Sequence, residues 1–153
     1  MALNFAEAAG KKVAEIERPP LPPEGHYIWQ ITGLPKSETS KDELWDFLTV
    51  PCRAMEAKED VDMSDYKGAV TGITNSVKFI FEKSDEVKFE QTLFRCRNFF
   101  EKHCGVQAKA NDTLAQLINN SIHHQFLGPI QWTQDKADAE IYHANIGKTA
   151  PVS

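Results

Sequence analysis

Alternation of apolar and polar residues along the chain predicts a set of short strands. The clearest example is "SVKFIFEK", residues 76–83, in which every second side chain is apolar. Such alternation is typical of a strand with one buried face. Aromatic and β-branched residues predict two earlier strands, "GHYIWQITGL" and a segment from about Leu44 to Met55, separated by the turn chemistry of "GLPKSETSKDE". Near the end, "HQFLGPIQWT" and "EIYHANIGKTAPV" flank the polar "QDKADA" and predict an antiparallel hairpin.

Between the third and fourth strands the apolar period becomes helical. In "SDEVKFEQTLFRCRNFFEKHCG", large apolar residues recur at steps of three and four, which predicts one buried helix face. The predicted face consists of Phe89, Leu93, Cys96, Phe100 and Cys104. Ser84 is the expected N-cap, and Gly105 suits the left-handed residue after the last turn. A second short helix is expected from Asp112 or Thr113, because Thr113 and Gln116 have capping-box spacing.

The order of these elements predicts a mainly β, α+β fold. Three strands, a helical insertion and two strands match a five-stranded OB-like Greek-key barrel, with the helices between strands 3 and 4. A generic α+β sandwich is the alternative. Four prolines in residues 19–23 exclude a helix there. We therefore expect residues 1–24 to be an N-terminal arm and proline-rich spacer, and residues 25–153 to form the OB-like domain.

The second strand has an apolar stripe that predicts which of its side chains are buried. Every second residue from Leu48 to Ala54 is apolar and suited to the core. Trp45, Phe47 and Arg53 have the opposite parity, so we expect them to point outward. A β-bulge before Leu48 would reverse the direction of the two rings.

Aromatic and basic side chains on one outer face are typical of a surface that binds single-stranded nucleic acid. Burial of the apolar side of the third strand leaves Lys78 on the same outer face as Trp45 and Phe47. Lys36 and Lys41, in the first loop, extend this surface. A base stacked on an aromatic ring gains about 1–3 kcal/mol, and cations contact the phosphates. Trp132 and His143, on the last hairpin, are further candidates.

Composition limits the possible functions. The 153 residues fit one domain, 41% are hydrophobic and 25% charged, and the net charge is −5. A negative net charge argues against a protein whose whole surface binds nucleic acid, but a protein with this net charge can still have a local basic groove. Much of the excess acid lies in "EAKEDVDMSD", residues 56–65. The N-terminus lacks the pattern of a signal or transit peptide, and no apolar run is long enough for a membrane span, so we expect a cytoplasmic protein.

The sequence contains no motif that indicates catalysis or a cofactor. The phosphate-binding, nucleophile-elbow and zinc-protease patterns are missing from it, and its three cysteines lack CxxC spacing and are expected to be free thiols. The acidic "DVDMSDYKG" departs from a calcium loop, with Asp65 where the glycine is needed and Thr71 in place of the final glutamate. His103 and Cys104 are sequence neighbours on a helix and point apart, which disfavours joint metal ligation. We expect no metal, no cofactor and no enzymatic activity.

Two segments resemble a known group of phage proteins. The opening "PPEGHYIWQITGLPKSE" and the closing "FLGPIQWTQDKADAEIYHANIGKTAPV" are similar to small tailed-phage proteins that resemble single-stranded DNA-binding proteins encoded near replication and recombination genes. The resemblance covers roughly residues 20–152. It implies an OB-fold protein that coats single-stranded DNA in the host cytoplasm. Many such proteins end in an acidic tail that recruits partners, whereas this chain ends in "GKTAPVS".

The sequence thus favours a phage-type single-stranded DNA-binding protein. Its expected partners are single-stranded DNA and replication or recombination proteins, and it could form a homo-oligomer. The alternative is a protein-interaction module that uses the same barrel surface to bind a host or phage protein.

Overall fold

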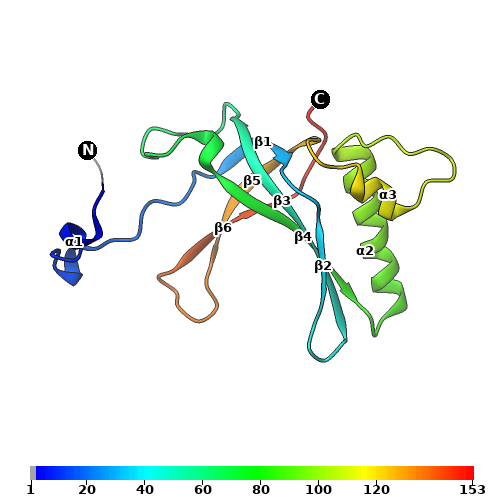
Figure 1. The fold of residues 1–153 in the computed structure, drawn as a ribbon, viewed down its shortest axis with the longest axis horizontal. Coiled ribbons are helices and arrows are strands. Elements are labelled where there is room, and N and C mark those ends of the chain that lie inside the picture. The colour runs from blue at the N-terminus through cyan, green and yellow to red at the C-terminus, as the bar shows by residue number, and fades with distance from the viewer. Residues whose placement is uncertain (1–2) are drawn as a thin grey trace.

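A twisted antiparallel sheet with helices against one part of it forms the body of the molecule (Figure 1). The computed structural model describes residues 3–153. The strand order is β2-β3-β1-β5-β6. Strands β2 and β1 pair with successive parts of one edge of β3, and β4 pairs with its opposite edge. The strands are β1 (Gly25–Ile31), β2 (Lys36–Thr39), β3 (Trp45–Ala57), β4 (Thr74–Glu82), β5 (Gln125–Gln134) and β6 (Tyr142–Ile146). A mainly β fold with a helical insertion after the third long strand is therefore confirmed.

The predicted apolar stripe of β3 faces the core. Leu48, Val50, Cys52 and Ala54 are all buried, with at most 7% of any of these residues exposed. They pack in one cluster with the aromatic residues of β1 and β5, including the fully buried Trp29. Alternation along one strand thus determined which side of the sheet became the core.

The register between β3 and β4 is continuous along its whole length. Residue pairs run without a shift from Trp45 opposite Glu82 to Arg53 opposite Thr74. The one bulge in β3's pairings lies elsewhere, in the β1–β3 ladder between Ile28 and Trp29. No bulge therefore reverses the first half of β3, and its two aromatic rings share the outer face with Arg53 as expected.

Strand β2 was not predicted. The sequence favours a loop there because "KSET" carries no apolar residue and all four residues are exposed. The segment nevertheless pairs along the first part of β3, from Lys36 opposite Thr49 to Thr39 opposite Asp46. Because backbone hydrogen bonds build this ladder, side-chain patterning gave no signal for it. The sheet thus has six strands where five were expected.

The long helix buries a slightly different face from the one predicted. Helix α2 (Glu86–Asn98) begins after Asp85, whose side chain accepts a hydrogen bond from the Lys88 N–H at 3.1 Å, so Ser84 is not the N-cap. Thr92 is buried and Leu93 is 40% exposed. The helix continues into one π-helical turn, η3 (Phe99–His103).

The π turn explains how two consecutive phenylalanines enter the core. Its wider spacing is marked by the bond from the Cys104 N–H to the Phe99 carbonyl, five residues earlier. Phe99 and Phe100 are both buried and lie edge to face with centroids 5.1 Å apart. Gly105 then adopts φ of +67°, as predicted for the residue that ends the helix.

The second short helix has the predicted cap. Helix α3 (Leu114–Asn119) starts with a complete capping box between Thr113 and Gln116. Only Leu117 of this helix is fully buried. Both helices lie at one end of the molecule in Figure 1, beside β4 and the end of the chain.

The sheet curls so that β4 approaches β6. The Asn75 side chain donates a hydrogen bond to the Ala144 carbonyl at 2.9 Å and thereby links these two strands. Among residues 3–153, no backbone ladder joins them. The backbone pairing therefore describes an open sheet whose two edges come close.

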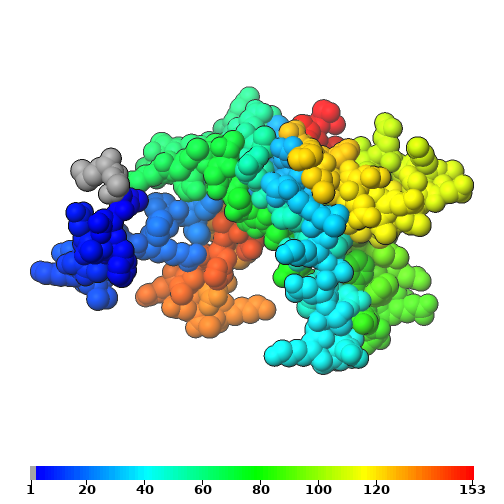
Figure 2. Space-filling model, viewed as in Figure 1, coloured from blue at the N-terminus to red at the C-terminus, as the bar shows by residue number. Residues whose placement is uncertain are grey.

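The N-terminal arm extends away from the sheet (Figure 2). It contains α1 (Phe5–Ala8) and a 3-10 turn, η1 (Val13–Glu15), and neither has a buried residue. The proline-rich spacer is anchored to the domain at its end. The Trp132 indole N–H donates to the Pro22 carbonyl at 2.8 Å, and the Tyr27 hydroxyl donates to the Pro23 carbonyl at 2.6 Å. Burial raises the pKa of Tyr27 to about 12, so its hydroxyl keeps the proton that it donates.

Candidate nucleic-acid interface

The outer face of β2, β3 and β4 carries rows of residues that lie side by side across the strands. One row consists of Lys36, Thr49 and Lys78, in that order. The neighbouring row consists of Glu38, Phe47 and Ile80. Trp45 follows beside Glu82. We call the outer-face residues of these rows the row surface: Lys36, Glu38, Trp45, Phe47, Thr49, Lys78, Ile80 and Glu82.

The rings of the row surface are only partly covered. Trp45 and Phe47 are half-buried, whereas Ile80 is 48% exposed. The ammonium group of Lys78 lies 5.6 Å from the centroid of the Phe47 ring, within the range of a cation–π contact. This contact holds a positive charge above an aromatic ring on the outer face of the sheet.

The cations predicted for this site have no acidic partner. Among the described residues, no carboxylate oxygen lies within 4.0 Å of Lys36, Lys41, Arg53 or Lys78. Other lysines nearby are paired, as shown by Lys83 with Asp46 and Lys88 with Glu82, each at 3.5 Å. The four predicted cations thus remain available to a phosphate.

Lys41 lies at the tip of the β2–β3 hairpin, in a turn held by side-chain hydrogen bonds. The Ser40 hydroxyl donates to Asp42 at 2.6 Å, and the Leu44 N–H donates to the same carboxylate oxygen at 3.1 Å. These bonds hold the pKa of Asp42 below its usual range, the Ser40 bond being the larger cause. Glu43 completes the turn with φ of +62°. Lys41 is therefore presented on a structured turn.

Arg53 lies on the same outer face but further along β3. It pairs with Thr74 of β4 on one side and with Gln30 of β1 on the other. It lies six positions after Phe47, about 20 Å along an extended strand. A strand of nucleic acid that contacts both would have to follow β3 over several nucleotides.

Trp132 and His143 lie on the β5–β6 hairpin and are not brought together with Trp45 and Phe47. The Trp132 N–H is used by the proline spacer, and His143 lies 2.9 Å from the Asp135 carboxylate. In Figure 2 a hollow separates this hairpin from the β2–β3 hairpin. The two residues are thus assigned to contacts within the chain.

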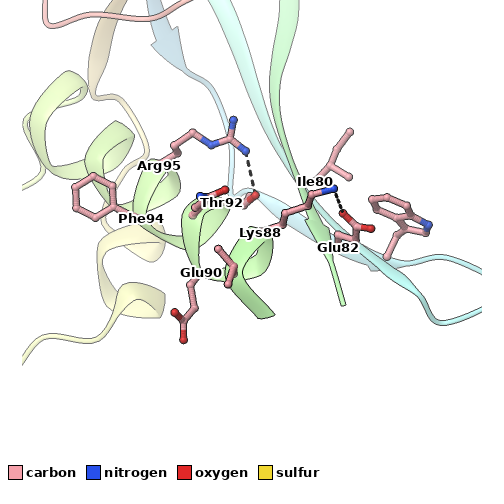
Figure 3. A pocket seen from close by; sticks show the side chains of 10 residues that line it. Ile80, Glu82, Lys88, Glu90, Thr92, Phe94 and Arg95 are labelled. Carbon is pink, nitrogen blue, oxygen red and sulfur yellow. Dashed lines mark hydrogen bonds and ion pairs between the residues drawn. The ribbon is translucent and has the colours of Figure 1, made fainter. Parts of the chain in front are cut away.

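An open groove borders the row surface on the α2 side. It has a volume of about 820 Å³ and is lined by Trp45 and Ile80 from the sheet and by α2. Figure 3 shows Lys88 of α2 reaching across to Glu82 of β4, and Arg95 directed to the Thr92 hydroxyl at 3.0 Å. The groove combines apolar walls with charges of both signs.

The acidic segment lies far from the two rings along β3. The acidic segment 56–65 starts at the C-terminal end of β3, whereas Trp45 and Phe47 lie at its N-terminal end. A 13-residue strand spans roughly 40 Å. Asp60 anchors the acidic segment through His26, whose ring Nδ1 lies 2.7 Å away. That bond is the largest cause of a lowered pKa of Asp60.

The three thiols lie in the core and not on this face. Cys52, Cys96 and Cys104 are free and buried, and burial raises the pKa of Cys52 and of Cys96 to about 12. In the part of the chain that the structure describes, no three His, Cys, Asp or Glu residues are grouped so that they could hold a metal.

No helix between residues 3 and 153 is long and apolar enough to cross a membrane.

Sequence reasoning missed two cations beside this face. Arg95 of α2 and Lys148, after β6, line one groove next to Lys78. Fifty-two residues lie between them in the sequence, so no local pattern signals their proximity.

No protein-family model matches the chain, and no curated protein matches it in sequence.

Proposed function

We propose that the protein binds single-stranded DNA through the row surface. The observation that carries this proposal is that two half-buried rings, Trp45 and Phe47, share one outer face with the unpaired cations Lys36 and Lys78. Sequence-tolerant binding of a single strand needs these two components, a π surface for bases and cations along the backbone.

Each residue has a distinct role in the proposed complex. Bases stack on Trp45 and Phe47, and Lys36 and Lys78 neutralise the phosphates on either side of Thr49. Arg53 and Lys41 contact the strand beyond the rings. Because stacking requires only a flat base, binding is expected to depend little on base sequence. The activity is binding alone, in support of replication or recombination in the cytoplasm.

The strand connections support an OB-like barrel as the scaffold. The chain pairs β1 with β3, β3 with β4, β1 with β5, and β5 with β6, and the Asn75 bond draws β4 toward β6. This set of strand pairs, with helices between β4 and β5, matches that of a five-stranded Greek-key barrel to which β2 is added. In such barrels the face of the second and third strands is a common site for oligonucleotides.

A second candidate function is supported by exposed apolar residues beside the row surface. Val87 and Phe94 of α2 are each 64% exposed and line the groove that contains Trp45. Large exposed apolar side chains around a groove are typical of protein-binding surfaces. The same face could thus bind a host or phage protein.

A gel-shift series separates these functions. Single-stranded DNA, double-stranded DNA and RNA of one length are each titrated with the protein and with a Trp45→Ala, Phe47→Ala variant. The proposal predicts a shift of single-stranded DNA that the variant loses. Absence of any shift at low salt, together with specific capture of one defined protein, would support the interaction module.

A further inference from the structure

A second groove lies on the other side of Lys78, between the sheet, the end of the long helix and the C-terminal segment. Its volume is about 540 Å³. Residues of β4, of α2 and η3, and of the segment after β6 line it. No pattern in the sequence indicates this place, which we call the C-terminal groove.

The charged residues that line the C-terminal groove are all basic. Its charged or titratable lining residues are Lys78, Arg95, His103 and Lys148, and no Asp or Glu lines it. Among the described residues, Lys78, Arg95 and Lys148 have no carboxylate within 4.0 Å. In a chain with 22 acidic and 17 basic residues, such a concentration of unpaired cations indicates an anion site.

Hydrogen bonds hold the walls of the groove in place. Nδ1 of His103 lies 2.7 Å from the Thr149 hydroxyl, and its Nε2 lies 3.4 Å from the Asn98 amide. This ring therefore joins η3 to the C-terminal segment. The segment is also paired with β5, through Leu127 and Ala150. Lys148 thus extends from a backbone that is fixed on both sides.

Lys78 belongs to both surfaces. It contacts the Phe47 ring on the row surface and also lines the C-terminal groove. A strand whose base stacks on Phe47 would bring its next phosphates past Lys78 and over the edge of β4. Arg95 and Lys148 are the next cations in that direction.

We propose that the C-terminal groove binds phosphate groups of the single strand that leaves the row surface over the edge of β4. This inference rests on the proposed function and specifies the path of the DNA. Arg95 and Lys148 act as phosphate contacts, and the polar Asn145 and Ser76 side chains complete the lining. The bound strand therefore leaves the row surface beside Lys78 and passes toward the end of the helix.

The test compares two lengths of oligo-dT in an Arg95→Gln, Lys148→Gln variant. Lengths of about 5 and about 15 nucleotides bracket the site sizes of many OB folds. We expect the variant to bind the long oligomer at least tenfold more weakly than the wild type, and the short one within about twofold. The slope of log affinity against log salt for the long oligomer should decrease in magnitude by about 1.4, or 0.7 for each lost phosphate contact.

A matched control removes two charges elsewhere. Lys67→Gln, Lys109→Gln changes the net charge equally at exposed positions outside the groove, and it should keep the wild-type affinity and most of the salt slope. Melting temperatures of all variants verify folding. As a second readout in the wild type, the His103 ring resonance should shift when the long oligomer is added.

The outcomes separate the two proposals. If the wild type binds both oligomers but the groove variant matches the control, the groove inference is wrong and the proposed function stands. If the wild type binds neither oligomer at low salt, both are wrong. An unchanged His103 resonance in a saturated complex would also contradict the proposed path.

Discussion

The direction of Trp45 and Phe47 is decided by their neighbours in β3. Leu48 and Val50 occupy the core, and an extended strand directs residues of opposite parity to the other face. The rings are half-buried because neighbouring strands supply side chains such as Ile80 and Lys78 beside them. The residue-level pattern thus leaves both rings partly exposed on the outer face.

Truncation of the rings should affect binding more than folding. Trp45→Ala and Phe47→Ala are each expected to lower oligo-dT affinity by about 5- to 150-fold, which corresponds to about 1–3 kcal/mol of stacking. The loss in free energy of unfolding should be smaller than the about 2–5 kcal/mol expected for the buried control Leu48→Ala. Urea denaturation and fluorescence anisotropy measure the two quantities. Equal affinities in wild type and ring variants would contradict the stacking role.

His103 should make the stability of the fold depend on pH in the mildly acidic range. Burial, with a smaller effect from Lys148, lowers the pKa of His103. Below about pH 6.5 the unfolded chain therefore takes up this proton more readily than the folded protein, so stability should decrease as pH falls from about 6.5 toward the lowered pKa. The stability that depends on the lowered pKa values of Asp60 and Asp135 is lost only below about pH 4.

Melting temperatures at pH 7.5 and 5.5 measure this effect. Wild type should lose more stability between the two values than His103→Gln, which cannot be protonated but can still bond to Thr149. An identical loss in both proteins would show that another group is responsible.

At the scale of elements, the arm and the spacer differ in their attachment. Deletion of residues 1–18 should leave the melting temperature unchanged, because α1 and η1 bury no side chain. Deletion of residues 1–24 also removes the carbonyls that accept bonds from Trp132 and Tyr27. An unpaired buried hydroxyl costs about 1–3 kcal/mol, so this variant should melt lower. Differential scanning fluorimetry distinguishes the two, and equal melting temperatures would contradict the anchoring role.

The elements that could be predicted are those whose own side chains face the core. Strands β3 and β4 show an apolar side in the sequence, and α3 shows its capping box. Strand β2 has no apolar side in the sequence, because its side chains are exposed and the strand is held by backbone pairing with β3. The buried face of α2 was only partly predicted. In the folded helix, which packs against the sheet and continues into the π turn, Thr92 is buried and Leu93 is exposed.

The same distinction holds for the candidate site. Trp45, Phe47 and Lys78 could be placed on one face because two strands with clear alternation happen to be neighbours. Arg95 and Lys148 could not, because their proximity depends on where a helix end and the C-terminal segment meet in the folded chain. Trp132 was a candidate by its aromatic type, but its N–H is used by the spacer.

At the scale of the whole molecule, the net charge of −5 is unevenly distributed. Acidic residues gather after the C-terminal end of β3, and unpaired cations lie around its N-terminal half and the C-terminal groove. Glu38 and Glu82 also lie on the row surface, beside Phe47 and Trp45, so basic charge is concentrated at Lys36, Lys78 and the C-terminal groove. Binding that depends on these few cations must weaken steeply as salt is added.

The central claim is tested most directly by titrating oligo-dT into a Trp132→Phe variant and following tryptophan fluorescence. Only Trp29, which is fully buried, and Trp45 remain to emit. We predict quenching that saturates at low salt, and an affinity that decreases by about 0.7 log units per log unit of salt for each phosphate contacted. Fluorescence that stays unchanged at low salt across the titration would contradict the claim that bases stack on the row surface.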